Sequence, residues 1–88
     1  MSVFEQITWA RHVLGIPPLM SWREIKQRYR TLSMTHHPDQ QGQNETMVAI
    51  NEAYEILKHY VEEYRFSFTD DEIAKQYPHD AHQKQFKF

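Results

Sequence analysis

The fold is decided by residues 21–39, which read SWREIKQRYRTLSMTHHPD. Ser21 and Glu24 have the spacing of a capping box, in which each side chain binds the other residue's backbone N–H, so a helix should begin directly after the serine. Pro38 disfavours helical geometry at the residue before it, and we therefore expect this helix to end at His37. Between these limits the apolar positions are spaced 3-4-3-4, which places them on one face of a helix. They are Trp22, Ile25, Tyr29, Leu32 and, at the end, His36.

A second amphipathic helix is expected after a polar loop. Residues 39–44 contain Gly42 and no large apolar side chain, which is typical of a turn. Asn44 is a suitable N-cap for the helix that follows. The apolar positions of that helix repeat at 3-4-3-4-3 and are Met47, Ile50, Tyr54, Leu57, Val61 and Tyr64. Two such helices joined by a short loop form an antiparallel hairpin.

A short helix is expected over residues 8–14, ahead of the hairpin. Thr8 is a candidate N-cap, and Gly15 is the residue type that usually follows a helix C-terminus. Pro17 and Pro18 then prevent the helix from continuing. Because a helix of this length is unstable alone in water, we expect it to pack across the hairpin.

The C-terminal part of the chain follows a different pattern. Thr69 and Glu72 form another capping box, which predicts a short helix near residues 70–77. We therefore expect an all-α fold with a three-helix core over residues 1–64. A C-terminal extension, residues 65–88, would carry the short helix and a polar tail.

The aromatic residues divide into two groups. Helical spacing assigns the first group to the core: Trp9, Trp22, Tyr54 and Tyr64. The second group is four phenylalanines of the extension, Phe66, Phe68, Phe86 and Phe88. We favour the interpretation that these four fold back over the hairpin, because a chain of 88 residues has little core of its own. The alternative is an exposed patch that recruits a client or a second copy of the chain.

Charge is unevenly distributed, although the formal net charge is only −2. Residues 11–38 hold five basic residues and one acidic residue, whereas residues 39–72 hold nine acidic and two basic residues. Either two solvated faces attract each other within one fold, or the basic half attracts an acidic partner. The acidic half would repel phosphate groups, so we do not expect nucleic acid as a partner.

Composition excludes several classes of protein. The chain has no cysteine, which rules out disulfides and thiolate metal sites and favours a reducing, cytoplasmic location. No apolar run approaches the roughly 18 residues that span a bilayer, so no membrane association is expected. The histidines lack the three or four convergent ligands of a zinc site, and no nucleophile or cofactor loop accompanies them. We therefore expect neither a metal nor a cofactor, and no enzymatic activity.

The exposed face of the helix after Ser21 carries a basic group. Arg23, Lys26 and Arg30 lie within an arc of about 60° on a helical wheel, about 110° round from the apolar stripe. Tyr29 borders both the basic group and the stripe. The face leads into a corner that proline stiffens, and this combination predicts a docking surface for an acidic partner.

The chain resembles the J domain, the module of DnaJ-type co-chaperones. Residues 23–39 resemble the family's second helix and its signature, which here is His37, Pro38 and Asp39. Residues 51–57, NEAYEIL, resemble the third-helix motif, and residues 13–16 resemble the exit of the first helix. The three segments occur in the family's order and spacing, and the resemblance covers roughly residues 4–60.

The resemblance implies a function. The chain would dock on a DnaK-type (heat-shock-protein-seventy) chaperone and stimulate its ATP hydrolysis, assisting protein folding. The residues implied to trigger the chaperone are His37, Pro38 and Asp39, and those implied to contact it are Arg23, Lys26, Tyr29 and Arg30. We expect a monomer that binds this chaperone. The alternative is an architectural J-like module that binds a partner without activating an ATPase.

Some positions depart from the family pattern. Arg28 stands where a small residue is common, which predicts either looser packing or an arginine that extends into solvent. Met47 replaces the usual phenylalanine, a change that a flexible apolar side chain should tolerate in a core. The basic fourth-helix motif and the glycine/phenylalanine-rich, zinc and client-binding regions of the family have no counterpart here, so the sequence resembles a minimal form.

Overall fold

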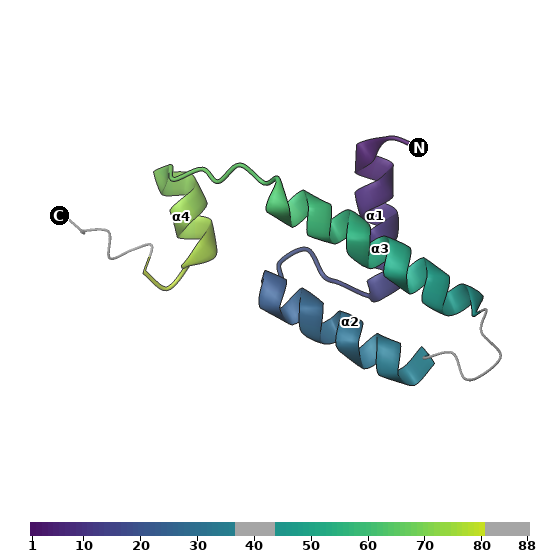
Figure 1. The fold of residues 1–88 in the computed structure, drawn as a ribbon. Helices are drawn as coiled ribbons and strands as arrows, with labels where there is room; N and C mark the ends of the chain where they lie inside the picture. The colour runs from purple at the N-terminus through teal and green to yellow at the C-terminus, as the bar shows by residue number, and fades with distance from the viewer. Residues whose placement is uncertain (37–43, 81–88) are drawn as a thin grey trace.

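The computed structural model describes residues 1–36 and 44–80, which form four helices (Figure 1). They are α1 (Val3–Leu14), α2 (Trp22–His36), α3 (Glu45–Glu62) and α4 (Asp70–Gln76). In Figure 1, α2 and α3 run antiparallel and α1 crosses α3, so the expected all-α hairpin with a helix packed across it is confirmed. None of the helices in these ranges is long and apolar enough to cross a membrane.

The first helix begins at Val3, well before the predicted start at Thr8. Ser2 Oγ accepts a hydrogen bond from the Glu5 N–H at 3.0 Å, and Glu5 Oε1 accepts one from the Ser2 N–H at 2.9 Å. This capping box satisfies two backbone N–H groups that would otherwise be unpaired at the start of the helix. The prediction that Thr8 caps the helix was therefore wrong, because Ser2 supplies a complete capping box earlier in the chain.

The end of α1 and the starts of α2, α3 and α4 follow the predicted signals. Gly15 ends α1 in the left-handed conformation, with a φ of 66°, which glycine adopts without steric cost. Ser21 and Glu24 form the expected capping box at the start of α2, with N–H to oxygen distances of 2.8 and 3.2 Å. Asn44 and Thr69 accept backbone hydrogen bonds at the starts of α3 and α4. The capping box predicted for Thr69 and Glu72 is only half formed, because the Thr69 N–H donates to Ser67 Oγ instead of the Glu72 carboxylate. Local capping chemistry thus sets most of the helix boundaries.

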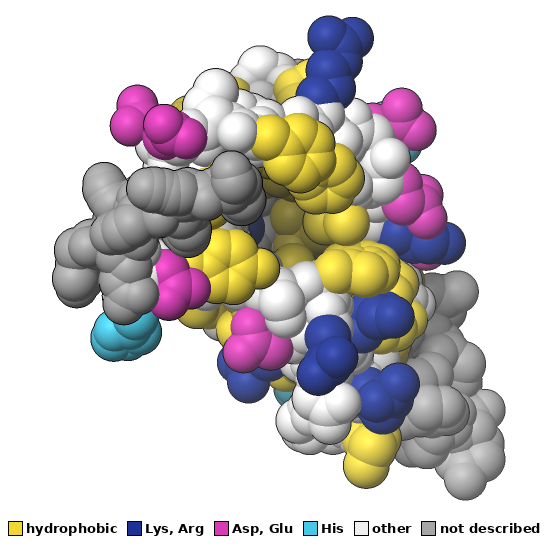
Figure 2. All heavy atoms as spheres, turned by 90° about the vertical axis from the view of Figure 1, so that its left-hand side faces the viewer, with side chains coloured by type: hydrophobic (Ala, Val, Ile, Leu, Met, Phe, Trp, Pro, Cys, Tyr) yellow, Lys and Arg dark blue, Asp and Glu magenta, His cyan; other side chains and the backbone are white. Residues whose placement is uncertain are grey.

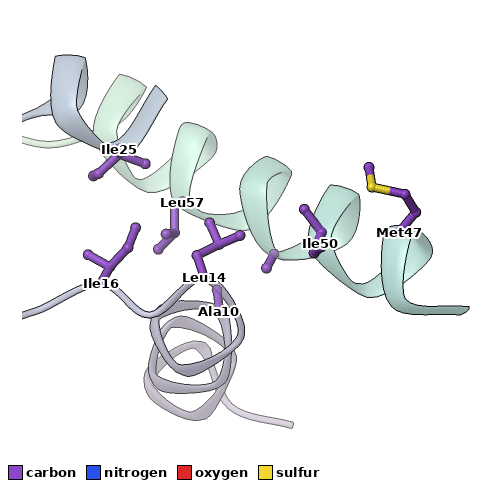
Figure 3. Packing of buried hydrophobic residues seen from close by; sticks show 8 residues of the cluster. Ala10, Leu14, Ile16, Ile25, Met47, Ile50 and Leu57 are labelled. Atoms are coloured by element: carbon purple, nitrogen blue, oxygen red, sulfur yellow. The ribbon is translucent and has the colours of Figure 1, made fainter. Parts of the chain in front are cut away.

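The core is small and centres on the crossing of α1 and α3. Figure 3 shows Ala10 and Leu14 of α1 directed towards Leu57 and Ile50 of α3. The buried residues of the cluster are Ala10, Leu14, Ile16, Ile25, Met47, Ile50, Ala53 and Leu57. Met47 is among them, as expected for this replacement of phenylalanine. From α2 only Ile25 is fully buried, and half-buried side chains complete its contact with α3.

The aromatic residues near the end of α3 do not join the core. The helix ends at Glu62, and Tyr64 is 41% exposed, so its assignment to the core was wrong. Phe66 and Phe68 are 72% and 79% exposed. They lie in the stretch that leads to α4. Because α4 contacts none of the other described helices, no described helix turns these rings back onto the hairpin.

The favoured interpretation of the extension is therefore wrong for Phe66 and Phe68. Phe86 and Phe88 lie outside the described residues. The short helix expected near residues 70–77 is confirmed as α4. The division into a core over residues 1–64 and an extension over residues 65–88 stays a prediction.

Arg28 connects α2 to the C-terminal end of α1. Its Nε donates a hydrogen bond to the carbonyl oxygen of Leu14 at 2.8 Å. That oxygen is one of the carbonyls that a helix leaves unpaired at its C-terminus, where the helix dipole also favours a cation. A Cβ added at Gly15 would lie 2.9 Å from Arg28 Nη2, so the glycine also leaves room for the guanidinium group. Arg28 is an exposed residue, as one of the two predicted alternatives required, but its guanidinium group is bonded to the end of α1.

Replacing Arg28 with alanine should lower the free energy of unfolding by about 1–2 kcal/mol, because a charged hydrogen bond to the Leu14 carbonyl is lost. Arg23→Ala is the matched control, since Arg23 is an exposed arginine on the same helix and Arg28 is the one bonded to Leu14. Urea denaturation followed by circular dichroism measures both variants. Equal stabilities of the two variants would show that the hydrogen bond does not connect the helices in solution.

The capping box at Ser21 should make the start of α2 sensitive to acid. Hydrogen bonds from the backbone and the side chain of Ser21 hold the pKa of the Glu24 carboxyl below its ordinary value. A carboxyl whose pKa is lowered by folding contributes stability above its unfolded pKa and loses it as the pH falls through the folded pKa. NMR titration of Glu24 should therefore give a lower midpoint in the folded chain than in urea. In the Ser21→Ala variant the difference between the two midpoints should become smaller but not vanish, because the backbone N–H of residue 21 still bonds the Glu24 carboxylate. Identical midpoints in the folded and unfolded native chain would show that the capping box does not lower the pKa of Glu24.

Candidate functional site

The basic face of α2 borders a groove between α2 and α3. The groove has a volume of about 400 Å³. Its lining combines cationic, hydroxyl and apolar side chains: Lys26, Tyr29, Arg30, Ser33, Met34 and Tyr54. Figure 2 shows several Lys and Arg side chains gathered on the lower part of the molecule, at the height of α2 in Figure 1. Three of the four side chains predicted to dock a partner are thus brought together, whereas Arg23 is exposed on α2 and does not line the groove.

Stacked aromatic rings hold the two walls of the groove together. Tyr54 of α3 stacks on Tyr29 of α2, with ring centroids 4.0 Å apart, and on Trp22, with centroids 5.4 Å apart. Aromatic pairs of this kind contribute about 0.5–1.5 kcal/mol beyond the area that they bury. Lys26 Nζ lies 5.8 Å from the centroid of the Trp22 ring, which is within the range of a cation–π contact. The stack therefore also orients one cation of the groove.

Tyr29 is held at both ends of its side chain. Its ring is stacked on Tyr54, and its hydroxyl donates a hydrogen bond to Asn51 Oδ1 at 2.6 Å. Next to it, Arg30 Nη1 donates a hydrogen bond to Gln27 Oε1 at 3.1 Å. Both residues are thus oriented by neighbours on α2 or α3. The arrangement presents two cations beside a fixed aromatic ring and an exposed Met34, which suits an acidic partner that also carries apolar side chains.

The signature residues His37, Pro38 and Asp39 lie outside the described residues. They follow directly on His36, the last residue of α2. Asn44 Nδ2 donates a hydrogen bond to the His36 carbonyl at 2.8 Å, and this bond joins the end of α2 to the start of α3. In the sequence, the signature therefore follows a residue whose carbonyl is bonded to the start of α3. The exposed Met34 lies near this same end of α2.

Comparison with known families identifies the fold. A family model described as the DnaJ domain matches residues 12–66. The chain belongs to the DnaJ domain family. The matched span contains α2, α3 and the signature residues, and it ends shortly after the last turn of α3.

Similar curated proteins are chaperones and co-chaperones by name. The chain is 48% identical over 48 residues to "Chaperone protein DnaJ" of Mycoplasmopsis pulmonis, which covers 51% of this chain and 13% of that protein. It is 41% identical over 59 residues to "Tetratricopeptide repeat and J domain-containing co-chaperone DNJ1" of Cryptococcus neoformans var. grubii, covering 67% of this chain and 11% of that protein. This J domain therefore corresponds to a small part of much longer relatives. No solved structure was found to match it.

Sequence reasoning missed some residues of the site in this J domain. Asn51 was recognised as part of a motif, but its bond to Tyr29 was not foreseen, and Ser33 and Met34 were not assigned to a site. The antiparallel register could have indicated the first of these contacts. The pair Tyr29 and Asn51, like the pair His36 and Asn44, is symmetric in the sequence about position 40.

The hydrogen bond between Tyr29 and Asn51 should be measurable by a double-mutant cycle. Tyr29→Phe and Asn51→Ala each remove one partner, and the double variant should show a coupling of about 0.5 kcal/mol, since the bond is exposed to water. Urea denaturation gives the free energies of unfolding. Tyr60→Phe combined with Asn51→Ala is the control, because Tyr60 is an exposed tyrosine on α3 with no bond to Asn51. Equal coupling in the two cycles would contradict the pairing.

Proposed function

We propose that this J domain is a co-chaperone that docks on a DnaK-type chaperone and stimulates its ATP hydrolysis. The observation that carries the proposal is the groove of Lys26, Tyr29 and Arg30, fixed by α3 and placed on the helix that runs into the signature residues. Membership of the DnaJ domain family and similarity to proteins named as chaperones and co-chaperones support this role. The chemistry of hydrolysis would belong to the partner, and this chain would not be an enzyme.

The α2 groove would recognise an acidic surface of the chaperone. Lys26 and Arg30 supply exposed positive charge, and Tyr29 supplies an aromatic face between them. Because exposed charges are screened by salt, the association rate should fall as ionic strength rises. The acidic residues of α3 would keep the rest of the chain away from the same acidic surface, which favours one orientation of docking.

Stimulation would arise from differential binding. A protein that binds the hydrolysing conformation of the ATPase more tightly than the resting conformation shifts the equilibrium towards hydrolysis. Such coupling is typically worth about 1–3 kcal/mol, or about 5- to 150-fold in an equilibrium constant. In this proposal the groove supplies affinity, and His37, Pro38 and Asp39 bias the conformation of the chaperone.

The decisive measurement is single-turnover ATP hydrolysis by a cognate DnaK-type chaperone, with increasing amounts of this chain. The native chain should accelerate hydrolysis. His37→Gln should abolish the acceleration at every concentration, with an unchanged circular dichroism spectrum. Lys26→Ala combined with Arg30→Ala should instead raise the concentration needed for half-maximal acceleration, because it removes only charges of the groove.

Arg65→Ala is the control for loss of positive charge, since Arg65 is exposed but lies outside α2. It should stimulate as the native chain does. If the native chain bound the chaperone without accelerating hydrolysis, the architectural alternative would hold. If it neither bound nor accelerated, the co-chaperone proposal would be wrong.

A further inference from the structure

A second and larger groove lies between the N-terminal half of α1 and the C-terminal half of α3. Its volume is about 760 Å³. Half-buried Ile7 and Ile56 form its apolar centre, one from each helix, and exposed Val3, Tyr60 and Tyr64 extend the apolar surface outwards. This groove could not be foreseen from a first helix that starts at Thr8, because it depends on the five residues, Val3–Ile7, by which α1 extends ahead of Thr8. No described helix covers it.

One side of this α1–α3 groove is an exposed series of aromatic rings. Tyr60 and Tyr64 meet edge to face with centroids 5.7 Å apart, and Tyr64 meets Phe66 in the same way at 5.3 Å. All three rings are substantially exposed, Phe66 most of all. Figure 2 shows exposed hydrophobic side chains above the Lys and Arg side chains on the viewed face. Exposed rings in contact with one another present both apolar surface and faces that attract cations.

The edge of the α1–α3 groove is acidic. Glu52, Glu55 and Glu63 line it, against a single arginine, Arg65, and one histidine, His59. Among the described residues, Lys75 Nζ and Glu72 Oε1 of α4 form an ion pair at 3.6 Å. The three glutamates of the groove form no ion pair with any described residue. Their carboxylates are therefore available to cations of a ligand.

We propose that the α1–α3 groove binds a basic amphipathic segment of another protein, in which lysine or arginine alternates with apolar side chains. The apolar side chains would contact Ile7, Ile56 and the tyrosine rings, and the cations would meet the glutamates at the edge. Charge complementarity selects this partner: phosphates of nucleic acid and anionic lipid headgroups would be repelled by the same three carboxylates. A basic peptide gains both apolar burial and ionic contacts.

This groove and the α2 groove lie on different sides of α3 and share no lining residue. The α3 positions that line the α1–α3 groove are centred about 170° round the helix from Tyr54, which faces α2. One chain could therefore hold a client segment on one side while α2 docks on a chaperone. The binding itself does not require that docking, so its test needs no chaperone.

The experiment measures fluorescence anisotropy of a labelled helical peptide of lysine, leucine and phenylalanine, with the full chain as titrant. A peptide with glutamate in place of each lysine is the ligand control. We expect the lysine peptide to bind and the glutamate peptide not to bind. Amide chemical-shift changes should concentrate at Ile7, Ile56, Tyr60 and Tyr64. Equal binding of both peptides, or shift changes confined to α2, would overturn the proposal.

Two variants test the residues of the groove. Glu55→Lys combined with Glu63→Lys should weaken the affinity about tenfold, because attraction becomes repulsion at two exposed sites. Tyr64→Ser should weaken it as well, and its exposed position means that the fold should survive, which circular dichroism can check. Asp70→Lys combined with Asp71→Lys makes the same change in net charge on α4 and should leave the affinity unchanged.

Other occupants give distinct results. If sedimentation showed a dimer that excludes the peptide, the groove would be an interface between copies of the chain and the proposal would be wrong. If the α4 control variant weakened the affinity for the lysine peptide as much as the groove variant, net charge alone would explain the effect. That result would also overturn the proposal. Binding to vesicles of anionic lipid with no binding of the lysine peptide would also contradict it.

Discussion

The fold depends on α3 being packed on two sides at once. On one side α1 crosses it, and Ala10 and Ala53, which have no exposed surface, allow the two helices to come close. On the other side Tyr54 stacks against two rings of α2. Helices of this length are marginal alone in water, so α1 and α2 are stable because α3 gives each of them a partner. Every surface argued to bind a partner is consequently formed with a residue of α3.

Contact between α1 and α2 is slight by comparison, and a polar bond supplies an important part of it. Arg28 reaches the last carbonyl of α1 across the gap that Gly15 leaves open. A smaller side chain at that position could not make this bond, and the two helices would then be held mainly through their separate contacts with α3. A charged residue in place of a small one thus provides a directional hydrogen bond in place of close packing. Because a chain of this length has a small core, one such bond is a larger fraction of the total stability.

Features that depend on neighbouring residues in the sequence could be predicted, whereas contacts between distant residues could not. Ser21 with Glu24, Gly15 and Asn44 act within a few residues of themselves, and they placed the helix boundaries correctly. The start of α1 was misplaced at Thr8 although its signal is equally local, because the capping box of Ser2 and Glu5 was overlooked in the sequence. The bonds of Arg28 to Leu14 and of Tyr29 to Asn51 join residues 14 and 22 positions apart, so they follow from tertiary packing. The exposure of Phe66 follows from the lack of contact between α4 and the other helices.

The arrangement of the helices places the basic and the acidic residues of the chain on different surfaces. A net charge of −2 says little, because the basic residues of α2 and the acidic residues of α3 act on opposite sides of one helix. Exposed ion pairs are individually weak, so neither groove should bind a partner tightly through charge alone. If both proposals hold, weak contacts on two separate sides would let the chain hold two partners at once and release each of them. Both sides nevertheless depend on α3, because Tyr54 lines the α2 groove and its neighbour Glu55 lines the α1–α3 groove.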